Sequence, residues 1–195
     1  MSTFKVIAIF AVAVLLATGC TTLQPAPQST TARYGIGSTP TAAQVSAWNI
    51  DVTPDGAGLP AGSGSVAQGR ALFTQKCAAC HGATGTGGPG GVLVGGQGTL
   101  ATAKPLLTIG SFWPYATIVY DYVNRAMPHD KPQSLKADEV YALTAFLLNQ
   151  NGVIAADAVM DAQTLPKVAM PNRKGFTQVD PRPDVNGSRC MQDCK

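Results

Sequence analysis

The chain has 195 residues, which is enough for one domain with extensions at its ends. Charged residues make up 13% of the chain, the formal net charge is +3 and no run of Lys or Arg occurs, so no nucleic-acid partner is expected. The 21 glycines and 14 prolines indicate long loops between helices.

The N-terminus has the pattern of a secretion signal. Lys5 precedes an unbroken apolar run from Val6 to Ala17, which is short for a transmembrane helix. The run leads to Cys20 through a sequence that resembles a bacterial lipobox, Leu16-Ala17-Thr18-Gly19-Cys20. We predict a signal peptide over residues 1–19, lipidation of Cys20, and a protein held by this anchor on the periplasmic side of a bacterial membrane. Cleavage nearby, which would release a soluble periplasmic protein, is the alternative.

Residues 20–47 are rich in Thr, Pro, Ala, Gln and Ser, a composition typical of a flexible tether. A folded domain is expected to follow over residues 48–155. Its first residues, Trp48 to Val52, have a strand-like pattern, and the Gly- and Pro-rich residues 54–64 are expected to be irregular. A first helix is predicted from about Ser65, its N-cap, to Gln75.

A C-x-x-C-H motif follows this helix directly, at Cys77-Ala78-Ala79-Cys80-His81. This motif is the attachment site of a c-type haem: the two thiols add to the vinyl groups on one porphyrin edge, and the His then binds the iron. A thioredoxin-like pair would need a βαβ pattern, and a zinc site would need further Cys or His nearby. The sequence offers neither, because its only other His is His129 and the next Cys is Cys190.

Residues 82–98 contain nine glycines, which indicates a loop packed against a flat ligand and excludes helix. No Lys-Ser/Thr pair ends the run and no strand precedes it, so a phosphate loop is excluded. Pro89 is expected to present the loop whose carbonyl accepts the His81 Nδ1 proton, and Gly90 or Gly91 could do this equally well.

Two further helices are predicted, over about Tyr115–Arg125 and Leu135–Asn149, with Ser134 as the cap of the second. The last helix should bury one stripe made of Val140, Leu143, Phe146 and Leu147. Arg125 is a candidate partner of a haem propionate, with a solvated helix end as the alternative. Trp113 and Tyr115 are candidate walls of the haem pocket or ordinary core aromatics.

The sixth ligand of the iron is assigned to Met127, which lies between the two helices and is followed by Pro128. A proline after the Met stiffens the loop and helps to keep the thioether directed at the iron. His129 and Met170 are the competing ligands, and packing of Met127 in the core is the alternative without ligation.

Residues 156–195 are expected to form an extended, Pro-rich tail that wraps over the domain or contacts a partner. With Cys20, Cys77 and Cys80 assigned, Cys190 and Cys194 remain and are predicted to form a disulfide in an oxidising compartment. A copper site at these two sulfurs is the alternative.

The order of these motifs resembles that of class I c-type cytochromes: Gly69-x-x-x-Phe73, C-x-x-C-H, Met-Pro, then Leu143-x-x-Phe146-Leu147. The resemblance covers residues 65–152. It implies an all-α fold of three to four helices around one covalently bound haem c. It also implies that the first and last helices cross, with Gly69 allowing their close approach and Phe73 meeting Leu143 and Phe146.

A narrower resemblance extends over about residues 48–184. It is to the cytochrome subunits that serve periplasmic molybdenum enzymes of sulfur oxidation, namely sulfite dehydrogenase and the Sox sulfane dehydrogenase. It is carried by Trp48-Asn49-Ile50-Asp51-Val52, Trp113-Pro114-Tyr115, Arg125-Ala126-Met127-Pro128 and Met170-Pro171-Asn172-Arg173. It implies a carrier of single electrons from such a dehydrogenase to a cytochrome or a terminal oxidase, rather than an enzyme. Sox subunits carry a second haem domain, whereas the one C-x-x-C-H motif here predicts a monohaem protein. A permanent relay subunit, and an open-site haem peroxidase or gas sensor, are the other functions to be tested.

Overall fold

The computed structural model describes residues 36–176. Residues 36–40 contain no helix or strand, and all the elements below lie in the unit that begins at Thr41. The predicted signal peptide, Cys20, Cys190 and Cys194 lie outside the described residues. Within residues 36–176 no helix has the length and apolar character needed to cross a membrane.

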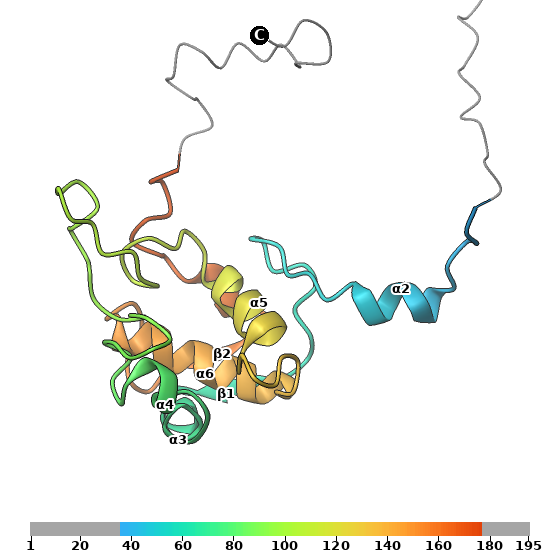
Figure 1. The fold of residues 1–195 in the computed structure, drawn as a ribbon, viewed down its shortest axis with the longest axis horizontal. Helices are drawn as coiled ribbons and strands as arrows, with labels where there is room; N and C mark the ends of the chain where they lie inside the picture. The colour runs from blue at the N-terminus through green and yellow to red at the C-terminus, as the bar shows by residue number, and fades with distance from the viewer. Residues whose placement is uncertain (1–35, 177–195) are drawn as a thin grey trace, which may run out of the picture. The chain divides into compact units, whose positions relative to one another are not determined.

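The first element is helix α2, Ala42–Trp48 (Figure 1). Thr41 caps it, because its hydroxyl accepts from the Gln44 N–H while the Gln44 side chain accepts from the Thr41 N–H. This helix occupies the end of the segment that composition indicated as tether, and none of its residues is buried. The strand-like pattern from Trp48 to Val52 was misleading: Trp48 ends α2, and residues 49–53 form no strand.

Strand β1, Ser63–Ser65, leads into helix α3, Val66–Lys76. Ser65 is the N-cap, as predicted, and forms a capping box with Gln68. The short helix α4, Ala78–His81, follows almost without a break and contains every residue of the C-x-x-C-H motif except Cys77. The glycine-rich residues that come next form turns and no helix, as expected.

Helices α5, Ala116–Ala126, and α6, Ala137–Gln150, complete the helical core, which Figure 1 shows gathered with α3 and α4. The predicted cap of α6 is wrong by two residues. Lys136 is the N-cap, and its N–H donates to Glu139 at 2.9 Å, whereas the Ser134 hydroxyl turns back to the Lys131 carbonyl at 2.7 Å.

Helix α6 is buried over nine consecutive residues, from Val140 to Leu148, and not only along the predicted stripe. Helix α3 crosses it at Gly69, where a Cβ would overlap the carbonyl oxygen of Ala142. The rings of Phe73 and Phe146 lie 5.1 Å apart at the same crossing. The close approach predicted for the first and last helices is therefore present.

The C-terminal segment is part of the domain as far as residue 176. Strand β2, Val159–Asp161, pairs antiparallel with β1, and the 3-10 helix η1 spans Leu165–Lys167. Met160, Leu165, Val168 and Met170 are all buried in the core. These residues of the predicted tail pack against the domain, and contact of the tail with a partner stays a prediction. The mainly helical architecture, with one small two-stranded sheet, agrees with the all-α class I cytochrome c fold.

Candidate haem site

A cavity of about 620 Å³ opens between α3, α4, α5, α6 and the glycine-rich loop. This volume lies in the range of pockets that enclose a cofactor, about 300–1,000 Å³. Its walls are mostly apolar, and the buried apolar residues of the lining are Phe73, Ile109, Val119, Val123, Leu135, Leu143 and Leu147. Several of the candidate site residues identified from the sequence line this cavity.

Cys77, Cys80 and His81 all line it. Cys77 caps α3 by donating its N–H to the Phe73 carbonyl, and His81 donates its N–H to the Cys77 carbonyl at 3.0 Å. This single turn brings both thiols and the imidazole to the cavity. His81 itself is 9% exposed.

The imidazole of His81 is oriented by the backbone of the loop. Its Nδ1 lies 3.0 Å from the Gly91 carbonyl oxygen, so Nδ1 is the protonated nitrogen and Nε2 is free to bind a metal. Of the three residues considered from sequence, Gly91 is thus the acceptor, and Pro89 lines the cavity instead. Gly90 must lack a side chain, because a Cβ there would lie 2.9 Å from the His81 Cε1.

Two of the three candidates for the sixth ligand line the same cavity. Met127 follows the last residue of α5, and His129 comes two residues later. Met170 is 3% exposed, belongs to the hydrophobic core and does not line the cavity. The geometry therefore keeps Met127 and His129 as candidates and places Met170 elsewhere.

The three other candidate pocket residues have different positions. Trp113 lines the cavity and meets Tyr122 edge to face, with ring centroids 5.6 Å apart. Tyr115 does not line the cavity, and its ring instead stacks under the guanidinium of Arg173 at 4.5 Å.

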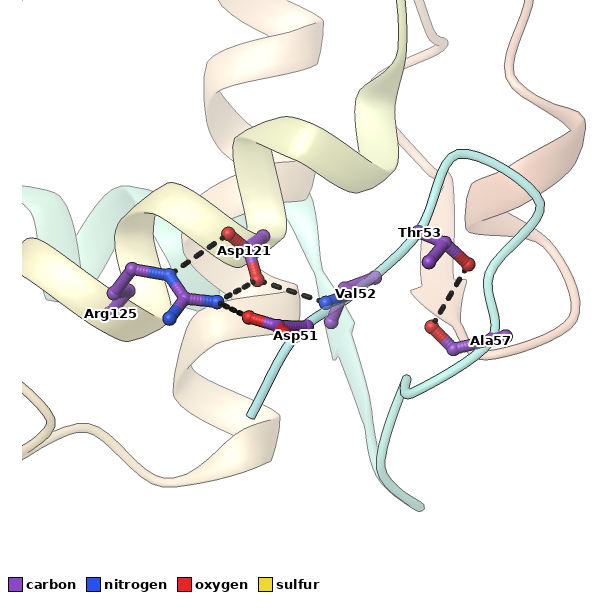
Figure 2. A network of polar contacts seen from close by, with 6 residues as sticks. All are labelled: Asp51, Val52, Thr53, Ala57, Asp121 and Arg125. Atoms are coloured by element: carbon purple, nitrogen blue, oxygen red, sulfur yellow. Dashed lines mark hydrogen bonds and ion pairs between the residues drawn. The ribbon is translucent and has the colours of Figure 1, made fainter. Parts of the chain in front are cut away.

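Arg125 is also absent from the cavity lining. Its guanidinium binds Asp121 and Asp51, at 2.8 and 2.7 Å, and these hydrogen bonds raise the pKa of Arg125 (Figure 2). The structure therefore gives Arg125 two protein carboxylates as partners in place of the expected propionate. The expectation rested on nearness in sequence to Met127, and the signal for the real partner, an Asp four residues earlier on the same helix, was visible.

The structure argues against the other uses of the C-x-x-C-H motif. A reactive dithiol needs a lowered thiol pKa, whereas burial raises the pKa of Cys77 to about 11. A zinc site needs several ligands together, and residues 36–176 contain no group of three or more His, Cys, Asp or Glu placed to hold a metal ion.

Asn151, the residue that follows α6, also supports the site, and it was not identified from the sequence. Its Oδ1 accepts from Gly95 N at 3.1 Å, and its Nδ2 donates to the carbonyls of Leu93 and Leu147 at 3.2 and 2.9 Å. Its own carbonyl accepts from Gln97 Nε2 at 3.0 Å. This one buried side chain ties the glycine-rich loop to the end of α6, and a lone Asn-Gly pair gives no sequence signal for such a role.

These residues fit a haem c. This cofactor needs two thiols one turn apart, an imidazole whose Nδ1 is hydrogen-bonded, a thioether and an apolar cavity, and all of these are present. Cys77 and Cys80 would hold it covalently, and His81 would bind its iron.

Comparison with known proteins supports the same cofactor. The family "Cytochrome C oxidase, cbb3-type, subunit III" matches residues 64–147. A chain in the crystal structure of the sulfane dehydrogenase SoxCD from Paracoccus pantotrophus is 43% identical, with a TM-score of 0.73. The alignment covers 84% of the present chain and 83% of that chain. No match was found among curated proteins.

The motif, the cavity and the fold agree with both matches, which together span most of the chain. The chain belongs to the class I c-type cytochromes, electron-transfer proteins that hold haem c covalently.

Proposed function

We propose that this cytochrome holds one haem c, with His81 and Met127 as axial ligands, and carries single electrons in the periplasm. The observation that supports this most strongly is a single cavity lined by Cys77, Cys80, His81 and Met127. When bound, haem c supplies one-electron chemistry between ferric and ferrous iron. The chain's own contribution is to hold the imidazole through Gly91, to offer a thioether and to exclude water with apolar walls.

The proposed electron donor is a molybdenum enzyme that oxidises sulfite or sulfane sulfur, and the acceptor is another cytochrome or a terminal oxidase. The 43% identity to a chain of the sulfane dehydrogenase SoxCD supports this donor class. The same similarity favours a second candidate, a relay subunit in a permanent complex with the dehydrogenase. Co-purification distinguishes the two: a permanent subunit brings a molybdopterin protein with it through gel filtration, and a free shuttle elutes alone.

The assignment of Met127 is tested by Met127→Ala. The variant should keep its covalent haem, lose the Met-to-iron charge-transfer band of the ferric spectrum and have a lower reduction potential, because a thioether favours ferrous iron. His129→Ala is the matched control and should keep the band. If Met127→Ala keeps the band, the ligand assignment is wrong. If the unchanged protein has no such band, an open-site peroxidase or gas sensor becomes the better hypothesis.

The proposed location is the periplasmic side of a membrane, with a lipid at Cys20. A disulfide between Cys190 and Cys194 is proposed for the same oxidising compartment. Both proposals rest on sequence patterns outside the described residues, and the first also on the similarity to a chain of SoxCD.

A further inference from the structure

Arg125 and Met127 are two residues apart at the C-terminal end of α5, but they have different surroundings. Met127 lines the cavity, whereas Arg125 binds Asp51, in the segment that precedes β1. The end of the helix that presents the proposed ligand is thus also attached to a distant part of the chain.

The attachment is a network of four hydrogen bonds (Figure 2). Arg125 Nη2 donates to Asp51 Oδ1 at 2.7 Å and to Asp121 Oδ1 at 2.8 Å, and Nε donates to Asp121 Oδ2 at 3.2 Å. Asp121 Oδ1 also accepts from the backbone N–H of Val52 at 3.0 Å. We call these residues, Asp51, Val52, Asp121 and Arg125, the α5 clamp.

The far side of the α5 clamp is firmly held. The Val52 side chain is 8% exposed and belongs to the hydrophobic core. The chain then turns, with Thr53 N donating to the Ala57 carbonyl at 3.0 Å. The Thr53 hydroxyl donates to the same carbonyl at 3.4 Å, which is the contact drawn in Figure 2. Further along, the Pro60 carbonyl accepts from the Tyr141 hydroxyl of α6 at 2.8 Å. A segment anchored in this way can restrain α5.

We propose that Arg125 is a positioning residue: through the α5 clamp it fixes the last turn of α5 and thereby keeps Met127 on the iron. This inference rests on the proposed ligation by Met127. It assigns to Arg125 a role in ligand retention that acts through the backbone and needs no contact with the cofactor.

The effect should be local. Asp51 is 71% exposed and Arg125 39% exposed at the side chain, so solvent and salt weaken their attraction and the α5 clamp contributes little to global stability. Release of an axial ligand, however, requires only that the end of one helix and its following loop open. Such local opening is governed by the few contacts at that place.

The test is a titration of the ferric holoprotein with imidazole, which binds iron only when the Met leaves. Arg125→Gln removes the charge and the two-pronged donor, and should tighten apparent imidazole binding on the order of tenfold. Arg125→Lys keeps a charge without the fork and should give a smaller change in the same direction. Asp51 lies 74 residues from Arg125 in sequence. Asp51→Asn should also tighten apparent imidazole binding, and this effect should be smaller at high salt.

Glu139→Gln is the control, since it breaks another partly exposed ion pair, with Lys76 at 2.9 Å, that does not involve α5. It should leave imidazole affinity unchanged; an equal increase there would overturn the proposal by showing a general loss of stability. Unchanged affinity in both Arg125→Gln and Asp51→Asn also overturns it. If Arg125→Gln does not fold, Asp51→Asn decides. Failure of Met127 ligation is recognised separately, by a charge-transfer band that survives in Met127→Ala.

Discussion

Gly69 lies where α3 crosses α6, and its hydrogen atom occupies a space in which a methyl group would overlap the Ala142 carbonyl oxygen. The Phe146 Cβ would also lie 2.7 Å from that methyl group. Because the conflict is with backbone, rotation of a side chain cannot relieve it. The two helices would have to separate, and the Phe73–Phe146 contact beside the haem cavity would loosen.

Gly69→Ala should therefore destabilise the ferric holoprotein. Overpacking costs about 1–3 kcal/mol, which exceeds the gain of about 1 kcal/mol from replacing a helical glycine with alanine. A guanidinium unfolding curve measures the difference. Gln75→Ala, at an exposed position of the same helix, should change the free energy of unfolding by less than about 0.5 kcal/mol. A Gly69→Ala protein as stable as the parent would contradict the close crossing.

Among the loops, the glycine-rich segment after His81 depends on one residue of another element. Asn151, at the end of α6, is 6% exposed and takes part in five hydrogen bonds, three of them with residues 93–97. A segment with so many glycines has little intrinsic order. Its shape, and with it one wall of the cavity, is imposed by the end of a buried helix.

Asn151→Ala should lower the free energy of unfolding by about 2–4 kcal/mol, because it removes the acceptor of the Gly95 N–H and one donor each from the Leu93 and Leu147 carbonyls. These two carbonyls each keep a backbone N–H donor. Asn149→Ala, which loses one bond to the Ile154 carbonyl, is the matched control and should cost about 1 kcal/mol. Thermal unfolding followed by circular dichroism compares the two. Equal losses would show that Asn151 has no special role.

The sequence predicted the start of a helix correctly where that start depends only on neighbouring residues. Ser65 was predicted as a cap because hydroxyl capping involves only the next three residues. The same rule failed at Ser134, where the competing acceptor, the Lys131 carbonyl, draws the hydroxyl away. At Trp48 a β-type composition was overruled by a capping box that starts at Thr41.

At the scale of the whole molecule, the haem-binding residues could be predicted because their chemistry requires fixed spacing. The roles of Arg125 and Asn151 could be predicted only in part. Asp121 and Leu147 are close to them in sequence, but their other partners, Asp51, Leu93, Gly95 and Gln97, lie more than 50 residues away. The sequence also did not predict that the two segments outside the helical core pack against each other. The segment before β1 and the C-terminal segment meet, since a Cβ at Gly56 would overlap the Pro166 side chain.

This contact, together with the burial of Met160, Leu165 and Met170, makes the described part of the C-terminal segment, residues 156–176, a structural part of the cytochrome domain. Leu165 of η1 is fully buried, at 0% exposure, and η1 contacts α5, the helix that leads to Met127.

Leu165→Ala should therefore lower the free energy of unfolding by about 2–5 kcal/mol, in a single cooperative transition that also disrupts the haem environment. Val159→Ala, at a residue 49% exposed in the same segment, should cost less than about 1 kcal/mol. Absorbance of the haem and far-ultraviolet circular dichroism, followed in one denaturant series, provide the measurement. If Leu165→Ala left both midpoints unchanged and only increased hydrogen exchange after residue 156, the segment would be an independent flap. The buried side chains of Met160, Leu165 and Met170 argue that the two midpoints will fall together.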